Sequence, residues 1–272
     1  MKHNNIKIDM NEVYIPYTTK RKPYAQDKGC CLQKNDVAVM VLCDGAGSCR
    51  LSHYGAEGMS RYIAEKFMSK WHRYRDMFSD DIKRNIYLDM VEEIVDLPVI
   101  YRKEFGDTEE NKDITYEDFG STLMAVITDG INGMGIHLGD GAILRSNEDG
   151  ARIMSYPMNG TRPGTTYLTS HVTAIDHFRF FRFRCKEDDN IALVTDGVEL
   201  HQEKQIRQIC GCMNKTELEL AVRANLLPDD ASAIKMTIRR QEADSTALTQ
   251  QNNAEENRWK DRERLQKALM KK

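Results

Sequence analysis

Short apolar runs that stop at an aspartate recur along this chain, and they constrain its fold more than any other feature. Residues 37–43, 134–138 and 191–195 are followed within two positions by Asp44, Asp140 and Asp196, and residues 231–239 are preceded by the pair Asp229-Asp230. Continuous apolar runs of this length are typical of buried strands. Because a rigid backbone holds a side chain at a strand end, we expect these carboxylates to point out of the core into a common crevice.

Carboxylates that converge in a crevice imply a cation. They repel one another and lose solvation, which is costly unless a positive charge neutralises them. Hard oxygen ligands suit magnesium or manganese. The alternative is that each Asp-Gly is an ordinary turn, which is the better interpretation of any one of them taken singly. Asp129-Gly130 fits that alternative as a hairpin turn, whereas Asp44-Gly45 is followed by Ala-Gly-Ser and a helical pattern.

The composition is that of an ordinary globular chain. The 272 residues are 40% hydrophobic and 30% charged, and the net charge of −3 argues against a protein that coats nucleic acid. We expect neither a membrane span nor a secretory signal, because no apolar run reaches 18 residues and the N-terminus has no apolar core. The seven cysteines, an odd number, indicate reduced thiols and a cytoplasmic location.

The remaining patterns predict an α+β fold. Apolar residues recur every three or four positions from Ala56 to Trp71 and over about 80–104, which predicts two long helices. Shorter helices are expected at about 198–208 and 214–226, and the first 30 residues read as polar and turn-rich. Hairpin-linked strands are expected at 37–43, 121–128, 134–138, 142–146, 151–155, 178–185, 191–195 and 231–239. Because strands and helices are grouped rather than alternating, antiparallel sheets are favoured over a doubly wound parallel sheet.

Two segments need separate interpretations. Residues 178–185 alternate aromatic residues and arginine apart from Phe180-Phe181, which predicts a half-exposed strand with a bulge at that slip. A basic and aromatic nucleic-acid surface is the less favoured alternative in a net-acidic chain. Residues 241–272 are polar and then charged, so we expect a solvated C-terminal tail, or a short helix from the spacing of Leu265 and Leu269, behind a domain of residues 1–240.

Taken together, these segments resemble the metal-dependent protein serine/threonine phosphatases of type 2C (the PPM family), and a bacterial branch in particular. The matching pieces occur in the family's order over about residues 25–238. They are Gln26-Asp27, Leu42-Cys43-Asp44-Gly45-Ala46-Gly47-Ser48, Gly55-Ala56, Phe119-Gly120-Ser121-Thr122, Leu138-Gly139-Asp140-Gly141, Thr195-Asp196-Gly197-Val198 and Asp229-Asp230-Ala231-Ser232. The resemblance implies a four-layer sandwich of two stacked antiparallel sheets flanked by helices, with metals in a cleft at one end.

The resemblance also implies catalytic roles. Asp44 would bridge two Mg²⁺ or Mn²⁺ ions, the Gly45 carbonyl would bind one of them, and Asp196 and Asp229 would complete the ligands of the first ion. A water activated by the two cations would then attack phosphoserine or phosphothreonine on a protein, with no covalent enzyme intermediate.

Further residues are assigned through the same resemblance. Asp27 would hold a water bound to a metal, and Asp140 would lie at a weaker third metal position. Arg21 and Lys22 precede Asp27 where family members carry a phosphate-binding arginine, although a solvated basic turn is an equal alternative. Arg162 lies in the long loop at 156–176, where the family has a mobile flap, and could meet the substrate phosphate or be an exposed surface arginine.

The chain departs from the family pattern beside the first aspartate. Ala46 replaces the usual histidine, and Gln26 stands where glutamate is common. Another group must therefore protonate the leaving serine oxygen. His53 is the nearest histidine in sequence, but we expect a water to take this role.

The resulting expectation is a cytoplasmic, bacterial phosphatase dependent on Mg²⁺ or Mn²⁺. Its partners would be a phosphorylated protein substrate and a cognate serine/threonine kinase, with no nucleic acid and no membrane. The alternative is a phosphatase-like scaffold that binds a phosphoprotein or signalling partner and hydrolyses it weakly or not at all.

Overall fold

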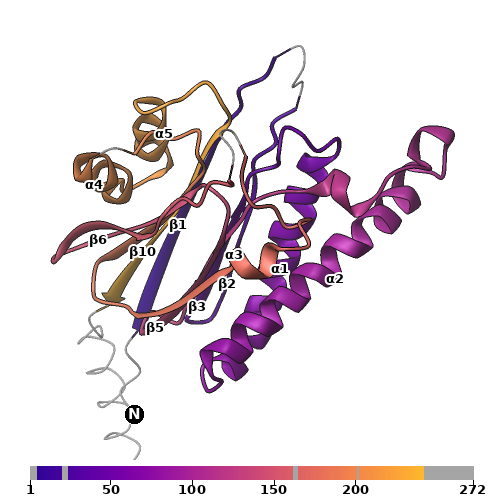
Figure 1. Cartoon of the computed structure of the whole chain (residues 1–272). Coiled ribbons are helices and arrows are strands. Elements are labelled where there is room, and N and C mark those ends of the chain that lie inside the picture. Colours follow the sequence, from indigo (N-terminus) through magenta and orange to yellow (C-terminus); the bar gives the residue numbers. More distant parts are fainter. Residues whose placement is uncertain (1–4, 20–23, 162–164, 201, 242–272) are drawn as a thin grey trace, which may run out of the picture.

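Two five-stranded antiparallel sheets lie face to face (Figure 1). The computed structural model describes residues 5–19, 24–161, 165–200 and 202–241. The first sheet has the order β1 (Asn5–Ile15), β10 (Ala231–Gln241), β9 (Asp189–Val194), β6 (Ala142–Asn147) and β7 (Gly150–Ser155). The second has the order β2 (Lys28–Lys34), β3 (Val37–Cys43), β4 (Leu123–Thr128), β5 (Asn132–Leu138) and β8 (Arg179–Arg184). The predicted α+β class is confirmed.

Helices cover the outer face of each sheet (Figure 1). The two long helices, α1 (Ser52–Tyr74) and α2 (Ser79–Phe105), lie over the second sheet, and α4 (Glu203–Gly211) and α5 (Lys215–Arg223) lie over the first. The short helices are α3 (Ala174–His177), η1 (Glu109–Asn111) and η2 (Tyr116–Phe119). The described part of the chain contains no helix that is long and apolar enough to cross a membrane.

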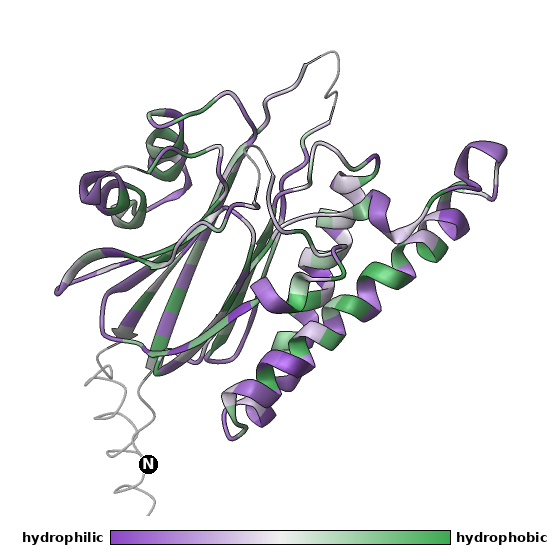
Figure 2. Ribbon diagram, in the orientation of Figure 1, coloured by the Kyte–Doolittle hydropathy of each residue, from purple (hydrophilic) through white to green (hydrophobic). Residues whose placement is uncertain are grey.

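Side-chain alternation along the strands divides the core into three layers. In β3, the odd-numbered residues from Val39 to Cys43 pack against the long helices, and the even-numbered residues from Ala38 to Leu42 pack against the first sheet. A strand buried on both faces reads as a continuous apolar run, as here. The third layer lies between the first sheet and α4 and α5. Figure 2 shows the corresponding apolar colour on strands and on helix faces. The sandwich therefore has four layers.

Two strands near the start of the chain, β1 and β2, were not predicted from the sequence. β1 pairs with β10 along its whole length, and β2 pairs with β3. The expectation of a turn-rich segment was wrong: Ile6, Ile8 and Met10 alternate with polar residues, which is the pattern of a half-buried strand rather than of turns. The pairing partners of the two strands, one of them at the far end of the domain, supply the stability that the local pattern does not indicate.

The bulge predicted in the arginine-rich strand is absent, because β8 pairs with β5 in unbroken register. Phe181 and Phe183 lie over Gly135 and Gly133, where a Cβ would come within 2.3 Å of the rings. Phe180 points to the other face, toward the helices. Arg182 on that face donates to the Tyr74 carbonyl at 3.0 Å, at the end of α1.

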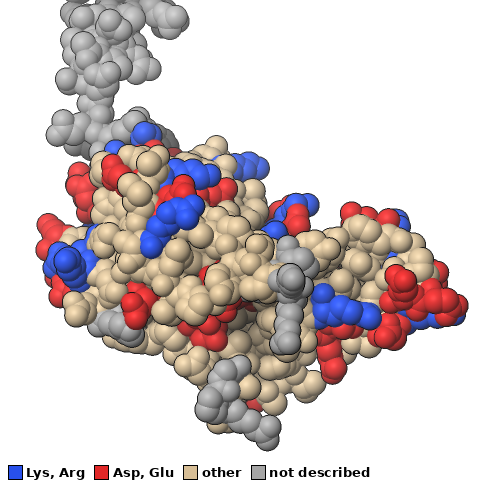
Figure 3. All heavy atoms as spheres, turned by 90° about the horizontal axis from the view of Figure 1, so that it is seen from above, with Lys and Arg blue, Asp and Glu red and all other residues tan. Residues whose placement is uncertain are grey.

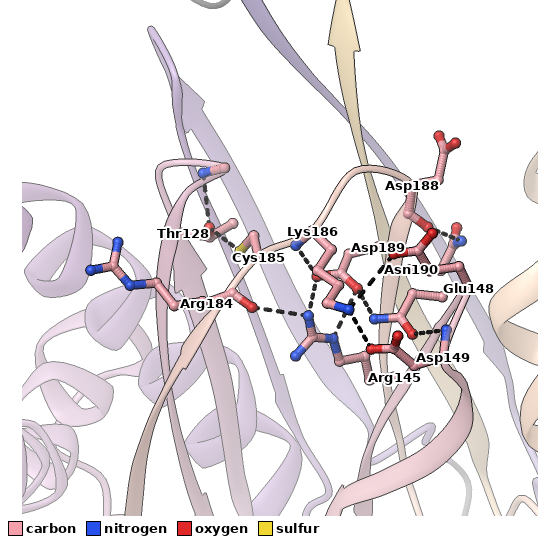
Figure 4. A network of polar contacts seen from close by, with 12 residues as sticks. Thr128, Arg145, Glu148, Asp149, Arg184, Cys185, Lys186, Asp188, Asp189 and Asn190 are labelled. Atoms are coloured by element: carbon pink, nitrogen blue, oxygen red, sulfur yellow. Dashed lines mark hydrogen bonds and ion pairs between the residues drawn. The ribbon is translucent and has the colours of Figure 1, made fainter.

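A buried ion pair joins β6 to β9 at the end of the sandwich away from Asp140 and Asp196 (Figure 4). Arg145 Nε donates to Asp189 Oδ1 at 2.9 Å, and Nη2 donates to Oδ2 of the same carboxylate. Asn147 Nδ2 and the Lys186 backbone N–H also donate to Asp189, each at 2.7 Å. A buried carboxylate with this many donors is fully satisfied, so the pair adds a side-chain link to the backbone pairing of the two strands.

Candidate metal centre

Three of the predicted aspartates meet at one end of the sandwich. One carboxylate oxygen each of Asp44, Asp140 and Asp196 lies within 4.8 Å of the other two. Asp44 follows β3 of the second sheet and Asp196 follows β9 of the first. Asp140 lies where the chain crosses from β5 in one sheet to β6 in the other. The two sheets therefore each supply part of the cluster.

The three aspartates line a cleft of about 610 Å³. Figure 3 looks onto this end of the molecule, where acidic atoms gather in a hollow of the surface. Gly45 lines the same cleft. Asp229 lies at its rim, exposed and outside the group of three. The predicted substrate contacts Arg21, Lys22 and Arg162 lie outside the described residues. No lysine or arginine lines the cleft within the part of the chain that is described.

Backbone hydrogen bonds fix the position of Asp44. Its N–H donates to Thr122 Oγ1 at 2.9 Å, and its carbonyl accepts from the Thr122 N–H at 2.8 Å. Gly45 is packed so closely that a Cβ would lie 2.9 Å from the Ser52 backbone. Ser52 opens α1. The residues after Asp44 are thus held between β4 and the first turn of this helix, which explains why Asp44-Gly45 is not a hairpin turn.

The pair Asp229-Asp230 divides into one exposed and one buried carboxylate. Asp230 is 2% exposed and accepts hydrogen bonds from the backbone N–H groups of Tyr17, at 2.5 Å, and Gln26, at 2.7 Å. A Cβ on Gly197 would lie 1.9 Å from the Asp230 carbonyl, so only glycine fits after Asp196. Asp230 is a structural residue that sequence reasoning missed. The doubled aspartate was the only signal, and it does not indicate which side chain is buried.

Asp27 lies beneath the cluster rather than in the cleft lining. It is 3% exposed, and its Oδ2 accepts from Thr195 Oγ1 at 2.9 Å. Its Oδ1 is buried without a hydrogen-bond partner among the described residues. Burial raises the pKa of Asp27 to about 7, against polar neighbours that lower it, among them Ser232 and the Thr195 hydroxyl that donates to Oδ2. This orphaned oxygen marks a place for a further donor or a water.

The ionised form of these aspartates is destabilised by burial and by their mutual repulsion. Burial, followed by the nearby Asp27 and Asp196, raises the pKa of Asp44 well above its usual range. Burial and then Asp196 raise the pKa of Asp140 to about 6, and its Oδ1 has no hydrogen-bond partner among the described residues. Hard oxygen ligands that repel one another are the donor set that Mg²⁺ or Mn²⁺ requires. The residues present therefore fit the predicted divalent cations.

His171 is a cleft residue that the sequence interpretation missed. It lines the same cleft, and its Nδ1 accepts from the Leu168 N–H at 3.3 Å. Partial burial lowers its pKa, which favours the neutral ring. Because Nδ1 accepts a hydrogen bond, the proton of the neutral ring is assigned to Nε2. The loop is fixed to the metal end, because the Thr169 N–H donates to the Ser121 carbonyl at 2.8 Å. His53, by contrast, stacks on Tyr24 with 5.0 Å between ring centroids.

Comparison with known proteins places this geometry in a family context. The sequence model of the protein phosphatase 2C family matches residues 19–227 of this chain. The serine/threonine phosphatase of S. agalactiae is similar in structure, with a TM-score of 0.59 and 13% identity over 85% of this chain and 99% of that one. Phosphatase Stp1 from Staphylococcus aureus has a TM-score of 0.58 and 13% identity, over 85% of this chain and 95% of that one. The catalytic domain of phosphatase PstP, solved with two manganese ions, has a TM-score of 0.54 and 12% identity, over 86% of this chain and 99% of that one. No curated protein matches.

Proposed function

Because the chain belongs to the protein phosphatase 2C family, we propose that it hydrolyses phosphoserine or phosphothreonine on proteins with the help of Mg²⁺ or Mn²⁺. The observation that carries the proposal is the convergence of Asp44, Asp140 and Asp196 from both sheets into one cleft. Its partners would then be a phosphorylated protein and the kinase that phosphorylates it.

The chain's own residues have separable roles in this proposal. Asp44, Asp196, the Gly45 carbonyl and the rim carboxylate of Asp229 would hold two divalent cations, with Asp140 available to a third. Bound cations of this kind supply an activated water and neutralise the phosphoryl oxygens. Asp27, buried beneath Asp44 with an unpartnered oxygen, would orient a water.

His171 supplies the hydrogen-bond donor that Ala46 cannot. With Nδ1 occupied by the Leu168 N–H, its Nε2–H can donate to an oxygen of a bound phosphate ester. The neutral form is favoured near pH 7 because the pKa of His171 is lowered. A donor of this kind orients the ester and does not require a charged imidazolium.

A scaffold without activity is the second candidate. It is favoured by one observation: the described part of the cleft lining contains no lysine or arginine to bind phosphate. A cleft that relied on cations alone would bind phosphate weakly in their absence.

The deciding experiment is hydrolysis of nitrophenyl phosphate and of a phosphothreonine peptide with Mn²⁺, with Mg²⁺ and with a chelator. We expect turnover of both substrates with added metal and none in the chelator. Turnover that persists in the chelator would rule out the metal mechanism. Binding of the phosphopeptide without turnover under any metal condition would establish the scaffold instead.

A further inference from the structure

A second groove lies between α1 and α2. It has a volume of about 350 Å³, and the rings of Tyr54, Tyr62 and Tyr101 line it. The two helices approach closely at Gly58, where a Cβ would lie 2.7 Å from Leu97 Cδ2. The negative face of a tyrosine ring attracts a cation, and Lys66 Nζ already lies 4.6 Å from the centre of the Tyr62 ring.

The charges along this groove are strongly one-sided. Four glutamates line it, Glu57, Glu65, Glu93 and Glu104, against a single arginine. That arginine, Arg61, is already paired with Glu57 at 3.2 Å. The groove therefore keeps an excess of negative charge that its own residues do not neutralise.

Glu93 is the most unusual of these residues. It is 7% exposed, and no described residue makes a hydrogen bond or ion pair with it. Burial, followed by the like charges of Asp96 and Glu65, raises its pKa to about 7. A nearly buried carboxylate without a partner is costly, and here it lines a groove that is open to a ligand.

The groove and the metal cleft are connected through adjoining residues. Tyr54 lines the groove, and its neighbour His53 stacks on the ring of Tyr24 at 5.0 Å. Two residues after Tyr24, Gln26 lines the metal cleft and its Nε2 donates to Ser52 Oγ at 2.7 Å. These contacts link residues that line the groove to residues that line the metal cleft.

We propose that this groove binds a lysine- or arginine-containing segment of the phosphoprotein substrate that flanks the phosphorylated residue. That the ligand is a phosphoprotein rests on the proposed function. That its flanking sequence is basic rests on the charge and the aromatic walls of the groove. A basic side chain would lie along the rings of Tyr54 and Tyr101, since Lys66 already covers Tyr62, and would bring its cation to Glu65, Glu93 or Glu104. The groove thus selects among phosphoproteins by the charge of the residues that flank the phosphorylated residue. The metal cleft does not distinguish these flanking residues.

The first test measures binding without catalysis. A fluorescein-labelled, unphosphorylated peptide with four lysine and arginine residues is compared with its glutamine analogue by fluorescence anisotropy, in chelator. We expect the basic peptide to bind at least about 10-fold more tightly, and a Glu65→Gln/Glu104→Gln variant to lose about 3- to 10-fold of that affinity. The control variant Glu148→Gln/Glu187→Gln, at the other end of the sandwich, makes the same charge change and should bind as wild type. Equal affinity for the two peptides would overturn the proposal.

The second test measures turnover and separates the two proposals. Phosphothreonine peptides with basic or glutamine flanks are compared, with nitrophenyl phosphate as the substrate that reaches only the metal cleft. We expect the groove variant to lower kcat/KM for the basic peptide by about 3- to 10-fold through KM, and to leave the other two substrates unchanged. If no substrate is hydrolysed, the proposed function fails and the binding test still judges the groove. Equal kcat/KM for both peptides in an active enzyme would overturn the groove alone.

Discussion

A carboxylate buried among other carboxylates raises the free energy of the folded chain. Asp44 is half-buried next to Asp27 and Asp196, and its raised pKa reflects both desolvation and their charges. Such an arrangement is retained where a ligand offsets its cost, as strained and desolvated groups at functional sites generally are. The metal cluster should therefore behave differently from an ordinary ion pair when one of its members is replaced.

For this reason Asp44→Asn and Asp196→Asn should each abolish turnover while the metal-free protein melts no lower than wild type. Replacing one carboxylate by its neutral isostere relieves repulsion in the absence of a cation. Hydrolysis of nitrophenyl phosphate with Mn²⁺ and thermal melting in chelator provide the two readouts. Asp188→Asn, exposed at the other end of β9, is the matched control and should change neither. A large fall in the metal-free melting temperature would indicate a structural role for the cluster instead.

Two histidines near the cleft make different contacts and should respond differently to substitution by alanine. A hydrogen bond to a charged phosphate contributes about 1.5–3 kcal/mol, so His171→Ala should lower kcat/KM for a phosphopeptide by about 10- to 100-fold. His53, stacked on Tyr24, should lose less than about 3-fold. If only the phosphopeptide is affected by His171→Ala, the donor acts on the leaving oxygen, whereas an equal loss with nitrophenyl phosphate indicates the phosphate oxygens. An unchanged rate in both variants would support the water that the sequence predicts.

Glu93 should impose a pH dependence on stability. Because its pKa is raised from 4.5 to about 7, the folded chain binds this proton more readily than the unfolded chain, and the free energy of unfolding falls as pH rises through that window. Glu93→Gln should therefore change little at pH 4.5 and stabilise the protein by about 1–2 kcal/mol at pH 8, less than the full shift because the groove is open to solvent. Urea denaturation at both pH values measures this. Glu92→Gln, an exposed neighbour paired with Lys66, should not stabilise at pH 8, and a pH-independent effect of Glu93→Gln would refute the assignment.

At the level of residues, sequence patterns predict which side chains could bind a metal better than they predict which side chains are buried. Asp44, Asp140 and Asp196 could be chosen because each follows an apolar run, and strand ends meet at one edge. The different positions of Asp229 and Asp230 could not be predicted, because they depend on hydrogen bonds to Tyr17 and Gln26, more than 200 residues away in sequence. His171 was missed for the same reason: its loop carries no periodic pattern, and only the contact with Ser121 places it at the cleft.

At the level of elements, one buried ion pair links β6 to β9 in addition to their backbone pairing. These strands carry Asp140 and Asp196 at their other ends, so their register fixes the spacing of the two carboxylates. Arg145→Met would leave Asp189 buried without its main partner and should lower the free energy of unfolding by about 3–5 kcal/mol. The double variant Arg145→Met/Asp189→Leu should recover part of this loss, which a double-mutant cycle in urea would quantify. Strictly additive losses would show that the pair does not act as a unit.

Elements differ in how far they could be predicted. β3 and β4 are continuous apolar runs because a sheet or helix covers each face, and α1 shows its buried stripe from Ala56 to Trp71. The alternation in β1 indicates a strand, but its partner could not be predicted, since β10 lies more than 200 residues away in sequence. The strands on either side of Asp140, β5 and β6, belong to different sheets, which the sequence pattern does not indicate. Sheet membership is decided by long-range packing, which a local pattern does not contain.

For the whole molecule, the site lies where the two sheets meet, so a bound cation would join them. Asp44 belongs to one sheet, Asp196 to the other, and Asp140 to the connection between them. A ligand that binds only the folded chain at about 100 times its Kd adds about 2.7 kcal/mol, which for a domain of this size is a rise in Tm of about 5–10 °C. We therefore expect Mn²⁺ to raise the Tm by this amount, in a single cooperative transition, and Asp44→Asn to abolish most of the rise. Two separate transitions, with Mn²⁺ shifting only one, would show that the sheets unfold independently and that the cation is held by one of them.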